Sequence, residues 1–373
     1  MVFEPMNVSG IASDLVRIPS VNPDGDPGTP QTGEAACAGW LSEFLSAAGA
    51  KAELREVLPG RPNVVARFPS NSPGKPRILF APHTDTVSVT GMTIAPFSGE
   101  IRDGRLFGRG ATDTKGPMAS MLWALKEAAS LIPSLPYEIW FAGLMGEEAG
   151  QHGAKALSAQ ETFDFVIAGE PTGLNVVHTH KGSAWLNLHT SGVAVHASKP
   201  EAGVNAIYKM CEAVDAIRTE LVPAFAKLLD PVLGHPTASV GTIAGGSKVN
   251  IVPDSCLAGV DLRTIPGQDL SIVEKILRAR VPDIEISMAV SHPLFTDPAH
   301  PLVRVLQRCG AELAGAPWFC DAAVFAAAGC PAIAMGPGSI AQAHTCDEYI
   351  SVSDLEKGAE FFLGFLRSIS PTA

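Results

Sequence analysis

The sequence has little positive charge and no long apolar run. Its 27 Lys and Arg residues stand against 38 Asp and Glu, a formal net charge of −11, which argues against a surface for nucleic acid or an anionic membrane. No uncharged apolar stretch reaches the roughly 18 residues that a membrane helix needs, so we expect no membrane span. The opening residues, MVFEPMNVSG, lack the basic segment and apolar run of a secretory signal.

The cysteines do not indicate a disulfide framework. The seven cysteines are odd in number, scattered along the chain and form no CxxC pair. This usage predicts a reducing compartment, which we take to be the cytoplasm, and no set of disulfides. We find neither an internal repeat nor a low-complexity tract.

The length of 373 residues and a hydrophobic content of 46% predict a globular chain of two domains. In the first half, strands and helices alternate, which predicts an α/β sheet covered by helices on both faces. Apolar spacing indicates helices over residues 8–18, 34–49 and 116–130, another that begins at 154–157, and strands over 63–67, 77–81, 137–144 and 165–168.

The pattern changes near residue 181. From there the order β-α-β-β-α-β is typical of a ferredoxin-like module; we place its strands at 183–191, 238–243, 255–263 and 284–290, and its helices at 201–221 and 270–280. A helix over 301–313, a strand over 331–335 and a helix over 352–368 follow. We therefore predict a catalytic domain, residues 1–180 and 292–373, interrupted by an α+β domain, residues 181–291.

Polar side chains that could carry chemistry come just after predicted strands or in glycine-rich turns of the α/β part. The carboxyl ends of such strands converge on one crevice, so groups far apart in sequence can meet there. They are His83 and Asp85 in HTD, Asp113 in GRGATDTKG, Glu147 and Glu148 in GEE, Glu170 in GEPT, and His344 in AHTCDE.

Imidazoles combined with carboxylates suit zinc, cobalt or manganese, and a carboxylate that bridges two ions is usual in two-metal hydrolases. Asp85 fits as a group that accepts the second N–H of His83 and fixes its tautomer. Of the adjacent Glu147 and Glu148, one can bind a metal while the other reaches a bound water.

Each of these motifs also has an ordinary structural interpretation. HTD can be a turn, GEE a solvated loop, Asp113 a helix cap, Glu170 a turn residue and His344 a structural histidine. A cysteine-dependent hydrolase that uses Cys346 beside His344 is a further alternative, but it leaves the carboxylates unexplained. Only the ordered set as a whole favours a metal site.

Over nearly its whole length the chain resembles the di-zinc aminoacylase/carboxypeptidase family, which includes acetylornithine deacetylase, succinyl-diaminopimelate desuccinylase and bacterial glutamate carboxypeptidase. The motifs that carry the resemblance are PHTD, GRGATDTKG, GEE, GEPT, SGVAVHASKPEAGVNAI, GGSKVNIVPD, DLRTIPG and GPG…AHTCDE. The resemblance implies a di-zinc exopeptidase-like catalytic domain, with a mixed sheet flanked by helices, and an inserted lid that commonly forms a homodimer.

The resemblance also implies roles for single residues. His83, Asp113 and Glu170 would bind one zinc ion; Asp113, Glu148 and His344 would bind the other, with Asp113 as the bridge. Glu147 would be the general base. In the inserted domain, His196 would reach a partner's active site to stabilise the oxyanion, and Asn250 and Arg263 would grip a substrate carboxylate. The backbone at Gly336 and Gly338 would form a wall of the substrate pocket.

The implied activity is hydrolysis of the amide bond of a small N-acyl amino acid by a zinc-activated water. The alternatives are a glutamate-type carboxypeptidase acting on a peptide and, more distantly, a non-catalytic homologue that binds carboxylates. Glu170, where the family's aminopeptidases have Asp, points to the deacylase and carboxypeptidase side. Two segments depart from the family: Trp318-Phe-Cys-Asp321 replaces a Gly-Thr/Ser-Asp turn, and His180-Lys-Gly-Ser183 replaces an arginine-rich turn, which weakens the case for a succinyl group.

Overall fold

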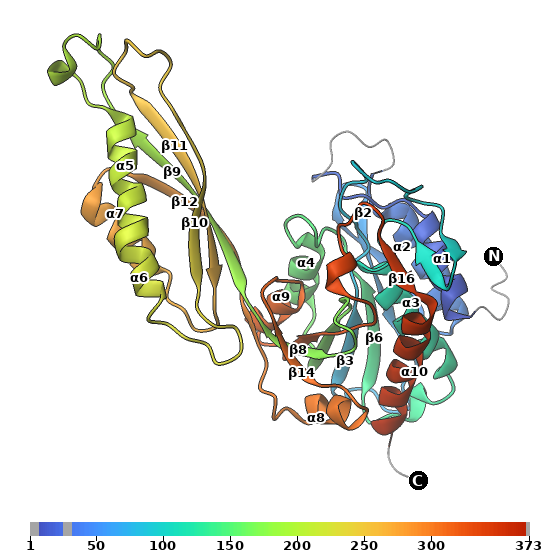
Figure 1. The fold of residues 1–373 in the computed structure, drawn as a ribbon. Helices are drawn as coiled ribbons and strands as arrows, with labels where there is room; N and C mark the ends of the chain where they lie inside the picture. Colours follow the sequence, from blue (N-terminus) through green and yellow to red (C-terminus); the bar gives the residue numbers. More distant parts are fainter. Residues whose placement is uncertain (1–6, 25–31, 371–373) are drawn as a thin grey trace. The chain divides into compact units, whose positions relative to one another are not determined.

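The computed structural model describes residues 7–24 and 32–370. The chain divides into two compact units (Figure 1). Unit 1 comprises Met1–His178, Thr296–Ala314 and Cys320–Ala373, and unit 2 comprises Thr179–Phe295 and Gly315–Phe319. The role of unit 2 as a lid or dimerisation domain stays a prediction.

Unit 1 is built on a mixed sheet in the order β1-β2-β6-β3-β7-β15-β8. β3 is parallel to both β6 and β7, and β7 is parallel to β15, whereas β1, β2 and β8 are antiparallel to their neighbours. The strands are β1 (Lys51–Leu58), β2 (Arg61–Arg67), β3 (Arg77–Ala81), β6 (Glu138–Gly143), β7 (Phe165–Ala168), β8 (Val176–His180) and β15 (Ala332–Ala334).

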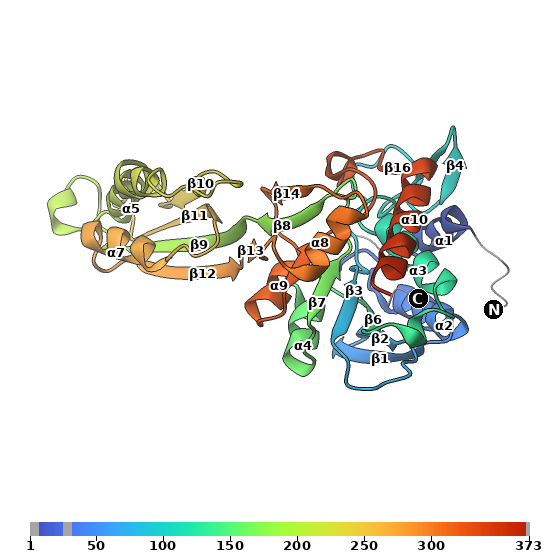
Figure 2. The same ribbon diagram turned by 90° about the horizontal axis from the view of Figure 1, so that it is seen from below.

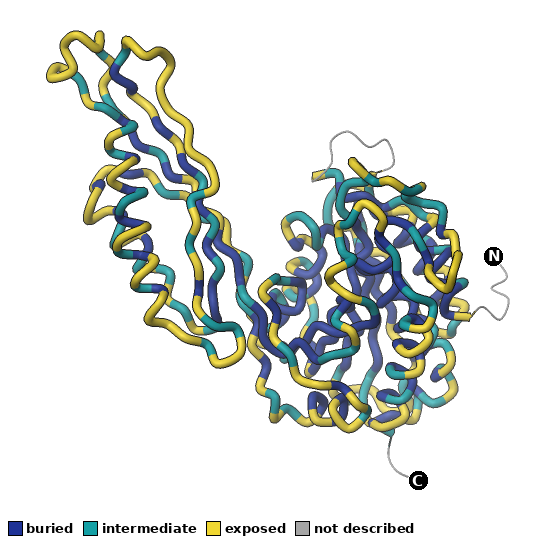
Figure 3. Tube along the Cα trace, in the orientation of Figure 1, coloured by how far each residue is buried: buried dark blue, intermediate teal, exposed yellow. Residues whose placement is uncertain are grey.

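Helices cover both faces of this sheet (Figure 2). On one face Phe80 of β3 packs edge-on against Phe362 and Phe365, and on the other Phe163 packs against Trp140 and Phe325. The first face carries α1 (Val8–Arg17), α2 (Ala35–Ala47), α3 (Lys115–Glu127), α8 (Pro301–Arg308) and α10 (Val352–Ser368), and the second carries α4 (His152–Gln160) and α9 (Ala322–Ala327). The buried residues gather between these layers (Figure 3).

A second, small sheet of unit 1 joins distant parts of the sequence. In it β5 (Arg105–Phe107) lies between β4 (Glu100–Arg102) and β16 (Tyr349–Ser351). Its register pairs Tyr349 with Phe107 and Ile350 with Leu106. The segment before α10 is therefore held beside the segment before α3.

Unit 2 contains an antiparallel sheet in the order β10-β11-β9-β12. Its elements follow the predicted β-α-β-β-α-β order: β9 (Gly182–Ser191), α5 (Ala206–Ala216), β10 (Thr237–Gly245), β11 (Ser255–Thr264), α7 (Ser271–Arg280) and β12 (Glu285–Ser291). Side chains of β9 alternate between buried and exposed. Those that are buried, such as Leu186 and Leu188, pack with residues of α5 and α7 in a core of their own.

The structure corrects two element boundaries. The helix predicted over 301–313 ends at Arg308 because Gly310 adopts a φ of 107°, and Leu313–Ala316 forms strand β14. The helix predicted over 201–221 begins at Ala206 and passes into a π-helical turn, Ile217–Leu221, which α6 (Val222–Phe225) follows. The short strand β13 (Leu294–Phe295) pairs with β8. Within the described parts of the chain, every helix is too short or too polar to cross a membrane.

Candidate metal centre

Three parallel strands bring the predicted site residues to one edge of the sheet. β3 and β6 are in register at Phe80 and Phe141, and β3 and β7 are in register at Ala81 and Ala168. The strands therefore end at nearly the same level. His83, the Glu147–Glu148 pair and Glu170 follow these three ends within a few residues, which is the position at which open α/β sheets place their functional groups.

One group of possible metal ligands consists of His83, Asp113 and Glu170. One ligand atom of each residue lies within 4.8 Å of the others, and all three residues are buried. His83 Nε2 is 3.0 Å from Asp113 Oδ1. The His83 ring is oriented by its other nitrogen, because Nδ1–H donates to the backbone carbonyl of Asp85 at 3.0 Å. This bond leaves Nε2 as the nitrogen that can bind a cation.

A second group consists of Asp113, Glu148 and His344, again with ligand atoms within 4.8 Å of one another. His344 Nε2 lies 3.2 Å from Asp113 Oδ2 and 3.3 Å from Glu148 Oε2. Asp113 belongs to both groups and faces one imidazole with each carboxylate oxygen. His344 has a φ of 63°, in the left-handed region that residues other than glycine rarely adopt.

The charges in this cluster fit a divalent cation. Burial, together with neighbouring carboxylates, raises the pKa of Glu147 and that of Glu170 well above the usual range, and burial beside Asp113 raises the pKa of Glu148 to about 7. The Glu148 Oε1 atom is buried without a hydrogen-bond partner among the described residues. An excess of buried carboxylate oxygens is the environment that a cation stabilises.

The pKa values of the two histidines are raised as well, which in their case favours the charged form. Hydrogen bonds with Asp113 and Glu148 raise the pKa of His344 to about 10. Burial acts to lower the pKa of His83, but its bonds with Asp113 and Asp85 outweigh burial and raise it well above its usual value. A bound metal would compete with protons for these ring nitrogens.

Asp85 does more than orient His83. Its Oδ1 accepts the backbone N–H of Glu147 at 3.0 Å, and its Oδ2 accepts that of Glu148 at 3.0 Å. The Nδ2 of Asn22 donates to Oδ2 at 2.8 Å, whereas His83 Nδ1 is 3.5 Å from Oδ1. The carboxylate thus anchors the turn that carries Glu147 and Glu148. The predicted partner of His83 needs correction, because its closest acceptor is the backbone carbonyl of Asp85 and not the carboxylate.

Two residues near the centre were not assigned from the sequence. Asn22 bonds Asp85 from the segment after α1, which carries no strand-end signal. Asp321 is 2% exposed, and neither of its oxygens has a well-formed hydrogen bond from the described residues. Burial raises the pKa of Asp321 to about 7, and its charge in turn raises the pKa of Glu147. The sequence did carry a signal for Asp321, because this residue ends the segment Trp318-Phe-Cys-Asp321, which stands where the family has a Gly-Thr/Ser-Asp turn.

Gly336 and Gly338 lie beside the turn that follows Glu170. Gly336 accepts hydrogen bonds from Thr172 and Leu174, and Gly338 accepts one from Gly173. A Cβ atom on Gly336 would lie 2.7 Å from the carbonyl oxygen of Glu170, so only glycine permits this approach. The two glycines therefore support Glu170, and their place in a substrate pocket stays a prediction.

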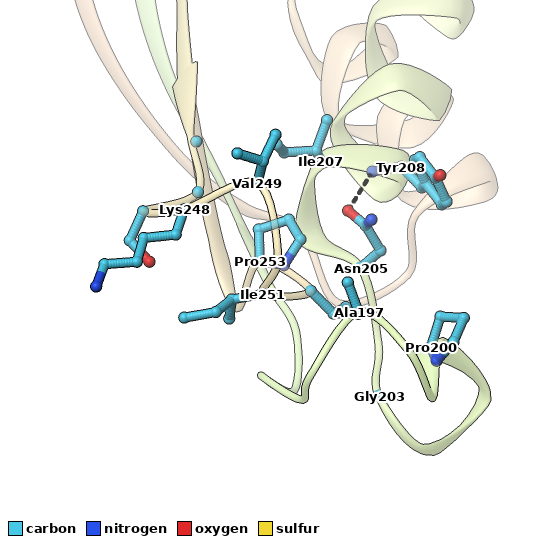
Figure 4. Close-up of a pocket in the computed structure, with 14 residues that line it drawn as sticks. Ala197, Pro200, Gly203, Asn205, Ile207, Tyr208, Lys248, Val249, Ile251 and Pro253 are labelled. Atoms are coloured by element: carbon cyan, nitrogen blue, oxygen red, sulfur yellow. Dashed lines mark hydrogen bonds between the residues drawn. The ribbon is translucent and has the colours of Figure 1, made fainter.

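The remaining predicted residues belong to unit 2. The segments of His196 and Asn250 are adjacent, since Ala197 N donates to Asn250 O at 3.0 Å and His196 forms an isolated bridge with Ile251. His196 Nδ1 lies 2.8 Å from Ser198 Oγ. Arg263 donates from Nε to Asp261 Oδ2 at 2.9 Å. Beside the His196 segment is a hollow of about 840 Å³ (Figure 4), and the residues of unit 2 that line it include Ala197, Asn205 and Tyr208 but not Asn250. The roles of His196, Asn250 and Arg263 stay predictions.

Comparison with known proteins identifies the class of this chain. Residues 79–368 match the model of "Peptidase family M20/M25/M40". Acetylornithine deacetylase from Proteus mirabilis is 30% identical over 364 residues, which cover 93% of this chain and 92% of that protein.

Solved structures give the same fold. The aminopeptidase PepT from Bacillus cereus superposes with a TM-score of 0.78 at 24% identity, covering 98% of each chain. The YXEP protein of Bacillus subtilis, described as a dinuclear metal binding peptidase from the M20 family, superposes with a TM-score of 0.68 at 14% identity, again covering 98% of each chain.

The chain is therefore an enzyme of the amidohydrolase and metallopeptidase class. It belongs to peptidase family M20/M25/M40. The predicted fold class and the predicted family are thereby confirmed.

Proposed function

We propose that this protein is a metal-dependent hydrolase that cleaves the amide bond of a small N-acyl amino acid at a centre for two divalent cations. The observation that supports it best is Asp113, whose two carboxylate oxygens lie 3.0 and 3.2 Å from the ring nitrogens of His83 and His344. A carboxylate between two imidazoles is suited to bridging two ions. We infer zinc, with cobalt or manganese as alternatives, because the ligand set combines imidazole and carboxylate.

The sequence relatives favour a deacylase over a peptidase. The Proteus mirabilis protein, similar along nearly all of its length, is an acetylornithine deacetylase. The dinuclear description of the YXEP protein supports two ions rather than one. Glu170 completes the first ligand group with a buried carboxylate, which agrees with the deacylase and carboxypeptidase side of the family.

In the proposed mechanism, Glu147 is the general base. Two divalent cations, when bound, would polarise the amide carbonyl and lower the pKa of a water molecule. Glu147 takes the proton of the attacking water and passes it to the departing amine. Its pKa is raised by burial and by Glu170, which makes it a stronger base than an exposed carboxylate. Asp85 fixes the backbone of Glu147 and so holds this base in place.

Unit 2 would bind the rest of the substrate and complete the site. Asp261 accepts from Arg263 Nε and so fixes the plane of the guanidinium, whose terminal nitrogens would hold a substrate carboxylate. Asn250 precedes the opposite end of β11, so its proposed contact with substrate is separate from that of Arg263. We further propose a homodimer through unit 2, in which His196 of one subunit stabilises the oxyanion in its partner. Strand β10 supports this idea, because it is an edge strand with largely exposed residues and such edges pair readily. The cytoplasmic location stays a prediction.

The test is a substrate panel. The protein is stripped with a chelator, reconstituted with Zn²⁺, Co²⁺ or Mn²⁺, and assayed with N-acetylornithine, N-succinyl-diaminopimelate, N-acetylcitrulline and acyl-glutamates. We expect hydrolysis of at least one N-acyl amino acid that disappears in the stripped protein and returns with metal. Release of C-terminal glutamate alone would favour the carboxypeptidase alternative. Metal binding without hydrolysis of any compound would favour the non-catalytic homologue.

A further inference from the structure

Asp113 lies on an irregular loop, residues 108–114, between β5 and α3. Two of its glycines adopt conformations that favour glycine, with φ of 144° at Gly108 and 81° at Gly110. Within the loop, Ala111 N donates to Gly108 O at 3.1 Å, and at its end Lys115 N donates to Gly110 O at 2.8 Å. These bonds leave the N–H groups of Gly110, Thr112 and Asp113 to be satisfied from elsewhere.

Glu348 satisfies all three. It is 0% exposed. Its Oε1 accepts from Thr112 N at 2.9 Å and from Asp113 N at 3.0 Å. Its Oε2 accepts from Gly110 N at 3.0 Å and from Arg109 Nη1 at 2.7 Å. All four donors belong to the loop, and one of them is the backbone of Asp113 itself.

The segment that carries Glu348 also carries His344, four residues earlier in the chain. Further bonds tie it to the loop, because Gly108 N donates to Glu348 O at 3.1 Å and Thr112 Oγ1 donates to Tyr349 O at 2.6 Å. The Glu348 carboxylate therefore connects the backbone of Asp113 to the segment of His344. Across this connection, His344 Nε2 lies 3.2 Å from Asp113 Oδ2.

We propose that Glu348 is a positioning residue of the metal centre, which sets the Asp113 carboxylate relative to His344 by holding the loop of residues 108–114. The inference rests on the proposed function, in which Asp113 bridges two cations. Groups that orient metal ligands typically contribute a factor of about 10–100 to metal affinity. A purely structural ion pair between Glu348 and Arg109 would contribute to folding but not to this affinity.

The chain offers a matched control in Glu34. This carboxylate is also 0% exposed and is paired with an arginine, accepting from Arg61 Nε at 2.9 Å and from Nη2 at 2.6 Å. Glu34 is the residue that precedes α2, and its bonds to Arg61 involve no backbone N–H of the Asp113 loop. Glu34→Gln therefore disrupts a comparable buried ion pair without touching the proposed connection.

The experiment titrates metal-free parent, Glu348→Gln and Glu34→Gln with Co²⁺, follows binding by its visible absorption, and records thermal unfolding of the metal-free proteins. Gln keeps one acceptor oxygen, so two of the four donors would face an amide NH₂. We expect Glu348→Gln to bind Co²⁺ about 10–100-fold more weakly than the parent, and Glu34→Gln to stay within about threefold although both unfold at lower temperature.

Unchanged Co²⁺ affinity in a folded Glu348→Gln protein would overturn the inference and leave the proposed function intact. A parent chain that binds no Co²⁺ would refute the proposed function, and the inference with it. If Glu348→Gln does not fold, Glu348→Asp, which keeps the charge but is one methylene shorter, enters the same titration with the same expectation.

Hydrogen exchange in the unmodified chain is a second test of the role of Glu348. In the metal-free protein, the amides of Gly110, Thr112 and Asp113 should be protected from hydrogen exchange, because Glu348 already binds them. Fast exchange that slows only when Co²⁺ is added would show that the metal, not Glu348, orders the loop.

Discussion

Replacing Asp85 with Asn isolates the anchoring role of this carboxylate. The substitution keeps the size of the side chain but removes its charge and one of two acceptor oxygens. If the amide oxygen takes the place of Oδ2, it retains the bonds from Glu148 N and Asn22 Nδ2. The new NH₂ group then faces the N–H of Glu147, which had bonded Oδ1 at 3.0 Å. Two donors would oppose each other in a buried site.

The size of the effect follows from these contacts. A hydrogen bond to a charged group contributes about 1.5–3 kcal/mol, and a buried donor left unpaired costs about 1–3 kcal/mol, so we expect the free energy of unfolding of Asp85→Asn to fall by roughly 2–4 kcal/mol. The turn that carries Glu147 also loses its anchor. We therefore expect kcat/KM to fall by about 10–100-fold, as for other groups that orient a metal site.

The assay combines denaturant unfolding with hydrolysis of the best substrate of the panel. Asp164→Asn serves as the control, because its carboxylate also accepts a backbone N–H, that of Arg77 at 2.8 Å, at the start of β3 rather than its end. The control should lose stability without a change in kcat/KM. If Asp85→Asn matched the parent in both measurements, Asp85 would not anchor the turn of Glu147 and Glu148.

Three further perturbations have defined outcomes. Glu147→Ala should keep both metals, by metal analysis, yet lose about 10²–10⁴-fold in kcat; near-parental hydrolysis would reject it as the base. Burial lowers the pKa of His180 to about 4, below its unfolded value, so protonation of this histidine destabilises the fold. Its contribution of about 3 kcal/mol to the free energy of unfolding should be lost as pH falls from about 6.5 to 4. Denaturant titrations should show this loss as the difference in pH dependence between the parent and His180→Gln. Mixed dimers of His196→Ala and Glu147→Ala subunits should regain one active site, and absence of that rescue would count against a shared site.

Two elements with regular burial were predicted with their observed bounds. β7 was predicted with its observed bounds because Phe165–Ala168 is one continuous buried run. α10 was also predicted with its observed bounds, since Ser351 caps it through Asp354 N and its apolar residues recur at helical spacing. The strands β4, β5 and β16 were missed, because strands of only three residues show no periodic pattern.

The same contrast applies to the site. The residues of both ligand groups could be proposed from the sequence because each follows a strand or lies in a glycine-rich turn, and the structure brings them together. The sequence could not show which backbone N–H groups Asp85 and Glu348 accept, because those bonds depend on segments more than sixty residues apart meeting in space. Asn22 was missed for the same reason.

Asp85 and Glu348 also explain how the fold can hold so many acidic groups together. Asp113, Glu147 and Glu148 repel one another, and their loops would separate unless something held them. The holding groups are themselves carboxylates, but they act on backbone N–H groups, so each loop is fixed through its main chain while its side chain stays available. Because these hydrogen bonds involve only the chain's own residues, the fold positions the ligands, and the cations would neutralise a site that is already assembled.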